Sequence, residues 1–429
     1  MFAAASLRAN TTITLIHFSD YHSHALPFYD EGRERGGIAR ALGLMERRKR
    51  EGALVFNGGD MMNKGAPAWS DKYHCAEWPW FNGIVDAMAL GNHDSDYGNE
   101  DFDRCRASVR YPILSANTAG FDRYRVFTRR GVRIGVFAVA GGDFSRLVTN
   151  AKFTFSDPVA AARDVVKTLR DTEHVDAVVM IGHEHADDDY KLAAAVPGID
   201  VILGTHTHLK RDLTLIPGTK TWFISPFQYL TYISEIELTF DKHRLTKVNG
   251  RLIPIDSSLK PDKEIERRVI DMQRSLEHDP SYRQLFVTIA KLPRPLEIDD
   301  LARFTVETMR DVTHADLAIS TASSFRQALP AGPINQEMLQ AALPYDNQIV
   351  VAQLTGDQLD KVLKLAAEGP ASDARAFSTP LATIDPSRTY TVAVTDYIAN
   401  VATAYRDLFR NTKLMNTELR VRSEVRKRL

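Results

Sequence analysis

The sequence predicts a layered α/β protein with a second, smaller α/β domain, and three observations lead to that prediction. Short apolar or β-branched runs alternate with helical segments along residues 13–240. Most of these runs end in glycine or polar residues. The chain has 429 residues, more than the roughly 250–300 at which a single core stops growing. We therefore expect two domains, with helices covering both faces of the sheet in the first.

The strand-like segments of the first domain each lead into a polar or glycine-rich turn. They are "ITLIHFSD" (13–20), "ALVFNGGD" (53–60), "AMAL" (87–90), "VRIGVFAVAG" (132–141), "DAVVMIGHEH" (176–185), "DVILGTHTH" (200–208) and "TWFISPF" (221–227). Helical segments are expected at 36–51, 157–173 and 187–196. Ligands gather at the C-terminal ends of strands in such sheets, so we expect the functional residues in these turns.

A charged amphipathic helix within 261–279 is expected to join the two domains. It follows "SEIELTF" (234–240), the closing strand of the first domain. The second unit is expected to hold helices at 298–313 and 355–368, an apolar segment at 315–320 and a strand-like run at 388–398. The expected divisions are 11–258 for the first domain, 259–285 for the linker helix, 286–415 for the second domain and 416–429 for a basic tail. Within this tail, "RVRSEVRKRL" (420–429) is interpreted as a solvated helix end.

The overall charge names no macromolecular partner. A formal charge of -1, with 25% charged and 44% hydrophobic residues, disfavours binding to nucleic acid or to an anionic membrane. No apolar run approaches the roughly 18–20 residues that span a bilayer. The N-terminal "MFAAASLRANTT" is a poor secretory signal, which leaves a cytoplasmic protein and a processed exported one both open. The oligomeric state is also open.

Two cysteines limit the chemistry that sulfur can supply. Cys75 and Cys105 are too few for a disulfide scaffold or for a cysteine-based zinc or iron–sulfur site. A single bridge between them is left open.

Oxygen and imidazole donors follow five of the strand-like runs. These donors are Asp20, His22, Asp60, Asn92, His93, His183, His206 and His208. The set contains no thiolate and suits Mn²⁺, Zn²⁺, Fe or Mg²⁺. Eight donors are too many for one ion. Two ions about 3.5–4 Å apart that share a carboxylate would use them, an arrangement that activates water and neutralises charge on a phosphoryl group.

The spacing of the donors supports this interpretation. Asp20 and His22, like His206 and His208, are two residues apart, so on an extended segment each pair would point to one side and serve one site. The "GGD" at 58–60 lets the backbone turn sharply, which allows the Asp60 carboxylate to approach both ions.

Simpler explanations exist for each feature taken alone. A lone histidine is more often a satisfied polar residue than a ligand, and "GNHD" can be a helix N-cap. His24 and His185 are near enough in sequence to support the ligands without binding metal, and Asp94 is given at most such a role. Five such elements in order, each at a strand end, favour the metal site.

Six motifs in order and spacing resemble the calcineurin-like metallophosphoesterases, and among them the bacterial 5'-nucleotidase/UDP-sugar hydrolase family. They are "SDYHSH" (19–24), "NGGD" (57–60), "GNHDSDYG" (91–98), "ILSAN" (113–117), "IGHEH" (181–185) and "GTHTH" (204–208). The resemblance spans about 11–255. It implies a four-layer α/β/β/α sandwich followed by a smaller substrate-recognition domain, shortened here. It also implies a phosphomonoester hydrolase with two divalent metal ions, Mn or Zn first, with Fe, Co and Mg compatible.

The resemblance also implies a role for each donor. One ion would be held by Asp20, His22, Asp60 and His208, and the other by Asp60, Asn92, His183 and His206, with Asp60 as the bridge. His93 would be the catalytic histidine that contacts the phosphoryl group, and Asp96 would orient its ring and hold it protonated. The reaction would be in-line attack of a metal-activated water on phosphorus.

The second domain resembles the same family less closely. Its segments "HADLAISTASSFRQAL" (314–329), "LPYDNQIVVAQLTGDQL" (343–359) and "YTVAVTDYIANVATAYRDLF" (390–409) match in order. The residues that would bind substrate are Asn117 from the first domain, Arg326 and Asn347 for polar groups, and Tyr397 and Phe377 for stacking on a base. The family's glycine-rich turns are replaced here by "SSF" (323–325) and "VATA" (401–404). These residues leave less room than glycine for close approach of the backbone, which weakens the expectation of a nucleotide substrate.

The expected partner is therefore a small phosphoester, with a nucleotide first, and no nucleic acid or membrane. Related chemistries on the same fold stay open: a 2',3'-cyclic phosphodiesterase, a nucleotide-sugar pyrophosphatase or a thiosulfohydrolase. A non-catalytic binding protein is disfavoured because all eight donors, His93 among them, are present.

Overall fold

The structure, a computed structural model, describes residues 10–65, 67–368, 374–381, 383–402 and 404–429. Residues 1–9, which make up most of the segment weighed above as a leader, and Thr403 of "VATA" lie outside these ranges. The chain divides into two compact units. Unit 1 comprises Met1–Phe28, Glu34–Lys64 and Trp69–Gln273, and unit 2 comprises Tyr29–Arg33, Gly65–Ala68 and Arg274–Leu429. Among the described residues, no helix is both long enough and apolar enough to cross a bilayer.

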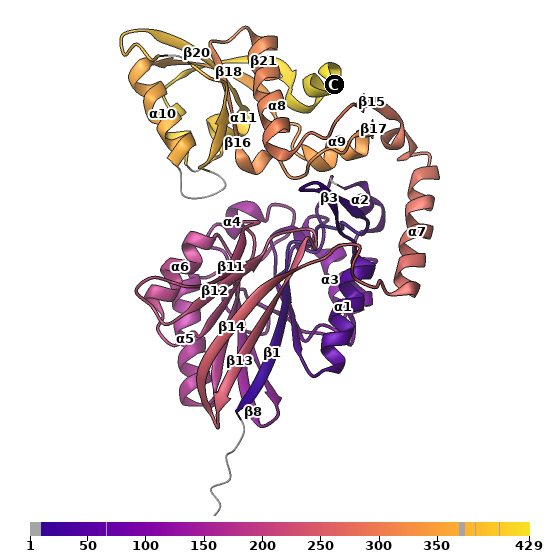
Figure 1. Ribbon diagram of the computed structural model, residues 1–429. Coiled ribbons are helices and arrows are strands. Elements are labelled where there is room, and N and C mark those ends of the chain that lie inside the picture. Colours follow the sequence, from indigo (N-terminus) through magenta and orange to yellow (C-terminus); the bar gives the residue numbers. More distant parts are fainter. Residues whose placement is uncertain (1–9, 66, 369–373, 382, 403) are drawn as a thin grey trace, which may run out of the picture. The chain divides into compact units, whose positions relative to one another are not determined.

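Unit 1 is built on two six-stranded sheets (Figure 1). The first has the order β14 (Arg244–Pro254), β13 (Tyr232–Asp241), β1 (Thr11–Phe18), β4 (Leu54–Asn57), β5 (Ala87–Ala89) and β6 (Ile113–Leu114). The second has the order β11 (Lys210–Leu215), β12 (Trp222–Pro226), β10 (Val201–Gly204), β9 (Ala177–His183), β8 (Val132–Ala140) and β7 (Tyr124–Arg129). In each sheet four neighbouring strands run parallel, β1-β4-β5-β6 and β12-β10-β9-β8.

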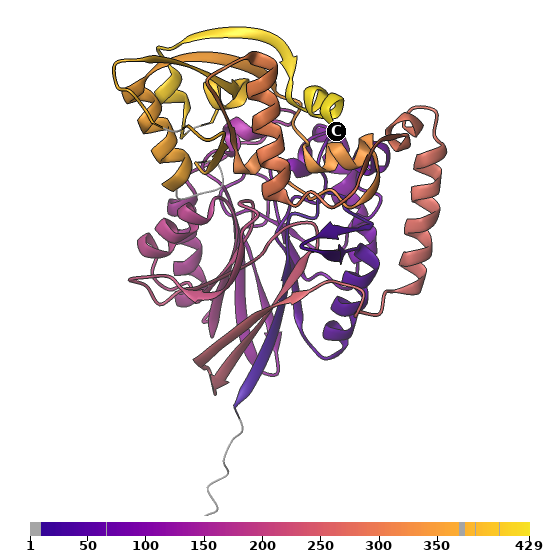
Figure 2. The same ribbon diagram turned by 45° about the horizontal axis from the view of Figure 1, so that its top comes forward.

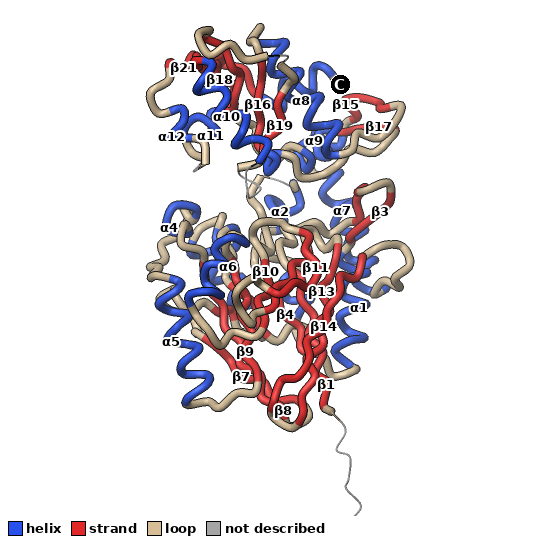
Figure 3. Tube along the Cα trace, turned by 60° about the vertical axis from the view of Figure 1, so that its left-hand side comes forward, coloured by secondary structure: helices blue, strands red, loops and turns tan. Residues whose placement is uncertain are grey.

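The two sheets pack face to face, and helices cover their outer faces. Leu15, Phe56, Val136 and Val179 belong to one buried cluster between the sheets. On the outer face of the second sheet, α5 (Pro158–Asp171) and α6 (Ala186–Ala195) bury residues such as Val165 against its strands. On the other side lie α1 (Ile38–Arg50), which Figures 1 and 3 show, and α3 (Asn99–Ser108), which Figure 1 shows. The four-layer α/β/β/α sandwich is therefore confirmed.

Unit 1 also contains shorter elements. They are α4 (Phe144–Leu147), the 3-10 turns η1 (Trp78–Phe81) and η2 (His93–Ser95), and most of α2 (Ala68–Tyr73). The strand pair β2 (Pro27–Asp30) and β3 (Arg33–Gly36) is divided between the two units, because Tyr29–Arg33 is counted with unit 2. Cys75 and Cys105 form a disulfide, with their Cα atoms 5.7 Å apart. The bridge that the sequence left open is thus present, and it ties the segment after α2 to α3.

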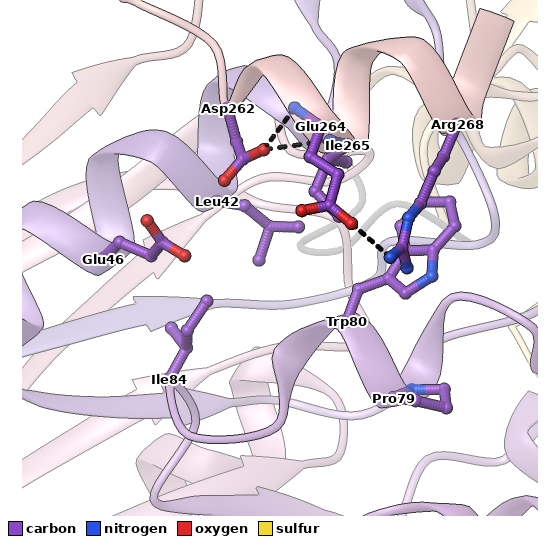
Figure 4. A pocket seen from close by; sticks show the side chains of 9 residues that line it. All are labelled: Leu42, Glu46, Pro79, Trp80, Ile84, Asp262, Glu264, Ile265 and Arg268. Atoms are coloured by element: carbon purple, nitrogen blue, oxygen red, sulfur yellow. Dashed lines mark hydrogen bonds and ion pairs between the residues drawn. The ribbon is translucent and has the colours of Figure 1, made fainter.

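The charged helix expected within 261–279 is α7 (Lys263–His278). It is amphipathic, since Val269 is only 5% exposed while its charged residues face outward. A pocket of about 310 Å³ lies between its first turns, α1 and η1 (Figure 4). Leu42, Trp80 and Ile84 supply apolar walls, and Glu264 pairs with Arg268 at its edge.

Unit 2 contains a five-stranded sheet with helices on both faces. Its strand order is β19 (Ala376–Ser378), β16 (Leu317–Thr321), β20 (Thr389–Thr395), β18 (Gln348–Thr355) and β21 (Lys413–Arg420). One face packs on α8 (Ile298–Thr313) and α13 (Val421–Arg428), and the other on α10 (Gly356–Glu368) and α11 (Asp396–Asn400). The unit also contains β15 (Thr288–Leu292), β17 (Gly332–Asn335), α9 (Gln336–Ala342), α12 (Arg406–Phe409) and the 3-10 turns η3 (Arg283–Phe286) and η4 (Ala322–Ser324).

The basic segment 416–429 does end in a helix, as expected for 420–429, but it packs against the rest of unit 2 and is not a solvated tail. Residues 416–420 belong to β21, which pairs antiparallel with β18. This strand is the long yellow strand of Figure 2. The rest forms α13, whose Val421 and Val425 are 5% and 0% exposed. Residues four apart share one helix face, so two valines are enough to anchor the helix, and the basic residues occupy the outer face.

Candidate metal centre

The loops after parallel strands bring the sequence-predicted donors of unit 1 together. Asp20 and His22 follow β1, Asp60 follows β4, and Asn92 follows β5. His183 ends β9, and His206 and His208 follow β10. The donors form two groups, in each of which one ligand atom per residue lies within 4.8 Å of the others. The groups are Asp20 with His22 and His208, and Asp60 with His183 and His206.

In the first group, two imidazole nitrogens and a carboxylate oxygen converge. The Nε2 atoms of His22 and His208 are 3.2 Å apart, and His208 Nε2 is 3.3 Å from Asp20 Oδ1. His22 Nδ1 lies 3.0 Å from the carbonyl oxygen of Met62 and must carry the proton, because a carbonyl only accepts. In the neutral ring, His22 Nε2 therefore presents a lone pair, the form in which histidine binds metal.

Asp60 lies between the two groups. Its Oδ2 atom is 3.3 Å from His183 Nε2 in one group and 3.7 Å from His22 Nε2 in the other. Its Oδ1 accepts the backbone N–H of His93 at 2.8 Å, which fixes the carboxylate plane. His183 Nδ1 donates to the carbonyl of Gly58 at 2.5 Å, so its Nε2 is the atom that faces the centre.

A buried amide oxygen indicates that the donors fit a cation. Asn92 is 7% exposed, and among the described residues its Oδ1 accepts no hydrogen bond. An unpaired buried acceptor costs stability unless a partner outside the protein satisfies it. Carboxylate, amide and neutral imidazole donors around such an acceptor form the ligand set of a divalent ion.

The backbone at five of the donors adopts an uncommon conformation. The φ angles of Asp20, His22, Asp60, His206 and His208 are all positive, between 48° and 56°. This left-handed region is costly for non-glycine residues, and such strain collects at functional sites. The expectation that residues 20–22 and 206–208 are extended is therefore wrong. Asp20 and His22 do join one group, but His206 and His208 separate into different groups.

Burial and neighbouring charges shape the ionisation of these groups. Burial lowers the pKa of His22 and of His206 below the usual histidine range, which keeps both rings neutral. Burial also opposes the charge on His183, but Asp60 and Asp20 together raise the pKa of that ring to about 9. For Asp60, burial is outweighed by the nearby histidines, led by His183, and its pKa lies well below the usual range. The bridging carboxylate is thus held as an anion.

His93 stands beside these groups and belongs to neither. Its Nδ1 is 2.8 Å from Asp96 Oδ2, and its side chain is 27% exposed. Asp94 lies in the same turn, between His93 and Asp96. It is fully buried and accepts hydrogen bonds from the backbone N–H groups of Asp60, Met61 and Gly91. It therefore holds two loops together. His24, a buried histidine two residues after His22, stacks on Tyr229 with ring centroids 3.5 Å apart.

The structure gives Asn117 a structural role in place of the substrate-binding one expected from sequence. The residue is 1% exposed, and its amide donates to the carbonyls of Ala140 and Ser156. Its Oδ1 accepts the N–H of Ala140 at 2.8 Å. These bonds use the polar atoms of the side chain, so none is left for a substrate.

The four other residues that the sequence predicts to bind substrate lie in unit 2. Arg326 Nη2 lies 3.2 Å from the Tyr345 hydroxyl, and Asn347 precedes β18. Phe377 is on β19 and contacts the Phe325 ring edge to face, with centroids 5.6 Å apart. The strand-like run predicted at 388–398 ends earlier in the structure, because β20 stops at Thr395. Tyr397 therefore lies on the short helix α11 and is partly buried against the sheet.

One acidic residue near the centre was missed by the sequence analysis. Asp143 lies within 4.8 Å, ligand atom to ligand atom, of His185 and His206. The sequence does contain a pattern that could have identified Asp143. The "GGD" at 141–143 repeats the "GGD" at 58–60, and both follow a strand, β8 in the case of 141–143.

Comparison with known families supports the same assignment. Residues 13–210 match the family model described as calcineurin-like phosphoesterase, and residues 291–379 match that of the 5'-nucleotidase C-terminal domain. Protein UshA of Escherichia coli (strain K12) is 25% identical, covering 94% of this chain and 88% of UshA. A 5'-nucleotidase of Vibrio vulnificus is 23% identical, covering 84% of this chain and 77% of the relative.

Solved structures share the fold over nearly the whole chain. A 5'-nucleotidase precursor from Thermus thermophilus has a TM-score of 0.75 at 21% identity, covering 97% of this chain and 96% of that one. The sulfate thiohydrolase SoxB of Thermus thermophilus has a TM-score of 0.72 at 19% identity, covering 97% and 94%. With two donor groups in unit 1 and matches to both family models, the chain belongs to the calcineurin-like metallophosphoesterases of the two-domain 5'-nucleotidase type and is a hydrolase of phosphoesters that uses divalent metal ions.

Proposed function

We propose that this hydrolase removes phosphate from nucleoside monophosphates at a centre of two divalent ions. One ion is assigned to Asp20, His22, Asp60 and His208, and the other to Asp60, Asn92, His183 and His206. The observation that carries this assignment is the position of Asp60, whose Oδ2 is within 3.7 Å of a histidine nitrogen from each donor group. A shared carboxylate is what a dinuclear phosphoesterase centre requires.

The donor set favours Mn²⁺ or Zn²⁺, with Fe, Co and Mg²⁺ compatible, because it mixes carboxylate, amide and imidazole without thiolate. When bound, such ions activate water for attack on phosphorus and neutralise charge on the phosphoryl group.

His93 is assigned to the phosphoryl group of the substrate. Its Nδ1–H donates to Asp96 at 2.8 Å, which leaves Nε2 as the atom that can hold a proton toward the substrate. The Asp96 carboxylate favours the charged form of the ring. A positively charged donor aimed at the developing negative charge of the transition state lowers the barrier.

The proposal that the substrate is a nucleotide is supported by the names of the relatives and by residues of unit 2. Relatives named 5'-nucleotidase match the chain, and a 5'-nucleotidase C-terminal domain matches residues 291–379. In unit 2 we assign Arg326 and Asn347 to polar groups of the substrate, and Tyr397 and Phe377 to stacking on the base.

Hydrolysis of a panel of substrates tests this proposal, with inorganic phosphate measured for the monoesters and nucleotide products measured for the cyclic nucleotides and UDP-glucose. Metal-free protein is reloaded with Mn²⁺ or Zn²⁺ and given nucleoside monophosphates, cyclic nucleotides, UDP-glucose and p-nitrophenyl phosphate. The proposal expects metal-dependent release that is highest for nucleoside monophosphates. Release from p-nitrophenyl phosphate alone would keep the centre and reject the substrate, and no release with any metal would reject both.

A further inference from the structure

A second histidine–aspartate pair lies beside the candidate metal centre. Asp143 follows β8 at the start of α4, and His185 is the N-cap residue of α6. His185 Nε2 is 3.5 Å from Asp143 Oδ2, and the two side chains are 29% and 23% exposed. This separation is longer than the usual 2.7–3.2 Å of an N–H···O hydrogen bond.

The same pair faces a proposed metal ligand. Asp143, His185 and His206 each offer one ligand atom, and these atoms all lie within 4.8 Å of one another. The rings of His185 and His206 meet edge to face with centroids 4.7 Å apart. Two donors that bind one tetrahedral ion at about 2.1 Å lie roughly 3.4 Å from each other. The spacing of His185 and Asp143 agrees with that value.

Charged residues of both signs lie near the three donors. Asp187 and Asp188 occupy the first turn of α6, directly after His185, and Arg146 pairs with Asp143 Oδ2 at 3.2 Å. Asp189 in the same turn is buried, and burial raises its pKa well above the usual range, so it adds no full negative charge. A helix N-terminus by itself repels a cation, and acidic residues in the first turn offset this repulsion. The exposure of Asp143 and His185 leaves the position open to ions from solvent.

We propose that Asp143, His185 and His206 form a third divalent-cation site. The inference rests on the proposed function in one respect, because His206 is also assigned there to the dinuclear centre. A neutral histidine has one lone pair for metal, so an ion held by Asp143 and His185 competes with the dinuclear centre for His206. Excess metal should therefore fill the third site and lower turnover.

Zinc binding to the full chain tests the proposal. Metal-free protein is dialysed against increasing Zn²⁺, and bound zinc per chain is measured by elemental analysis. We expect three ions per wild-type chain and two in Asp143→Asn and His185→Asn. Asparagine keeps the side-chain size at position 143 and is a favoured N-cap residue at position 185. His243→Asn is the matched control, because His243 also pairs with an aspartate, Asp176, at 3.0 Å on the surface of unit 1, and should bind three.

The zinc count separates failure of this site from failure of the proposed function. Two ions in the wild type and in every variant would overturn the third site and leave the dinuclear centre standing. Fewer than two in the wild type would overturn both. Three ions in Asp143→Asn and His185→Asn would also overturn the third site. As a second readout, turnover should fall at excess Zn²⁺ in the wild type and the control, and this fall should be smaller in the two site variants.

Discussion

At the scale of single residues, the hydrogen bond on one histidine nitrogen decides what the other nitrogen can do. Backbone carbonyls accept from Nδ1 of His22 and His183, which leaves Nε2 of both rings facing the proposed ions. The Asp96 carboxylate accepts from Nδ1 of His93 instead, which leaves Nε2 as the nitrogen that we propose faces the substrate. The partner of Nδ1 thus fixes which nitrogen of each ring is available for the role proposed for it.

Replacing His93 should remove catalysis without removing metal. We expect His93→Ala to lower kcat by roughly 10²–10⁴-fold, the usual contribution of a positioned proton donor. The ion content should equal that of the wild type, because His93 belongs to neither donor group. Steady-state phosphate release and elemental analysis on the same sample measure both. His243→Ala is the control and should keep its turnover. A parallel loss of metal would show that His93 is a ligand.

A buried glutamate near η1 should make stability depend on pH. Glu77 is 1% exposed, and burial raises its pKa to about 7, although the Tyr21 hydroxyl donates to it at 3.0 Å. The unfolded chain has a glutamate pKa of about 4.3, so the folded state binds more protons between these values. Stability should therefore fall as pH rises from about 4.3 to 7, by roughly 4 kcal/mol in total.

Glu77→Gln removes that titration. The thermal unfolding midpoint of the variant, compared with the wild type, should be relatively higher at pH 8 than at pH 5. Differential scanning calorimetry of metal-free protein at both values measures the comparison. An equal difference at the two pH values would show that Glu77 does not change its protonation within this window.

Sequence patterns revealed the donor types but not the backbone that aims them. The positions of Asp20, Asp60 and His206 after strands followed from alternation of apolar runs and turns. Their left-handed φ angles could not be predicted from these patterns, because contacts between residues distant in sequence offset the cost of that conformation. Asp143 was missed for a related reason. It meets His206 only once the strands of the second sheet are assembled.

At the scale of elements, the site depends on two loops that approach each other without side chains between them. A Cβ added to Gly59 would lie 2.8 Å from the backbone N of Gly91, and one added to Gly91 would lie 2.2 Å from that of Asp60. Asp94 joins these loops through three backbone hydrogen bonds. The glycines allow the approach, and the carboxylate fixes it.

Asp94→Ala should therefore loosen both loops. Each buried N–H left without an acceptor costs about 1–3 kcal/mol, so the loss should be on the order of 3 kcal/mol or more. For a unit of this size that corresponds to a fall of roughly 6–12 °C in the thermal midpoint. Asp122→Ala, at an exposed aspartate of the same unit, should shift the midpoint little. A midpoint unchanged in Asp94→Ala would contradict the role given to this carboxylate.

Helices and strands with strong periodicity were predicted closely, whereas the C-terminal segment was not. Helix α8 spans Ile298–Thr313, the range expected from its apolar spacing. Residues 416–429 carry so many basic side chains that composition indicates solvent exposure. Their place in the sheet depends on pairing with β18, more than 60 residues earlier in the chain, which local composition does not encode.

At the scale of the whole molecule, chemistry and recognition are assigned to different units. Every proposed metal ligand and His93 lie in unit 1, and the residues proposed for the base lie in unit 2. The division predicts that changes in unit 2 alter which phosphoester is bound and leave the chemical step intact.

Tyr397 offers the sharpest test of this division. If its ring stacks on a base, Tyr397→Ala should raise KM for a nucleoside monophosphate by roughly 5–150-fold, since stacking on one base contributes about 1–3 kcal/mol. The kcat should change little, and kcat/KM for p-nitrophenyl phosphate, which has no base, should stay near the wild-type value. Tyr397→Phe keeps the ring and should behave as wild type with both substrates. Equal losses on the two substrates would instead show that Tyr397 supports the packing of α11 against its sheet, because damage to the fold does not discriminate between substrates.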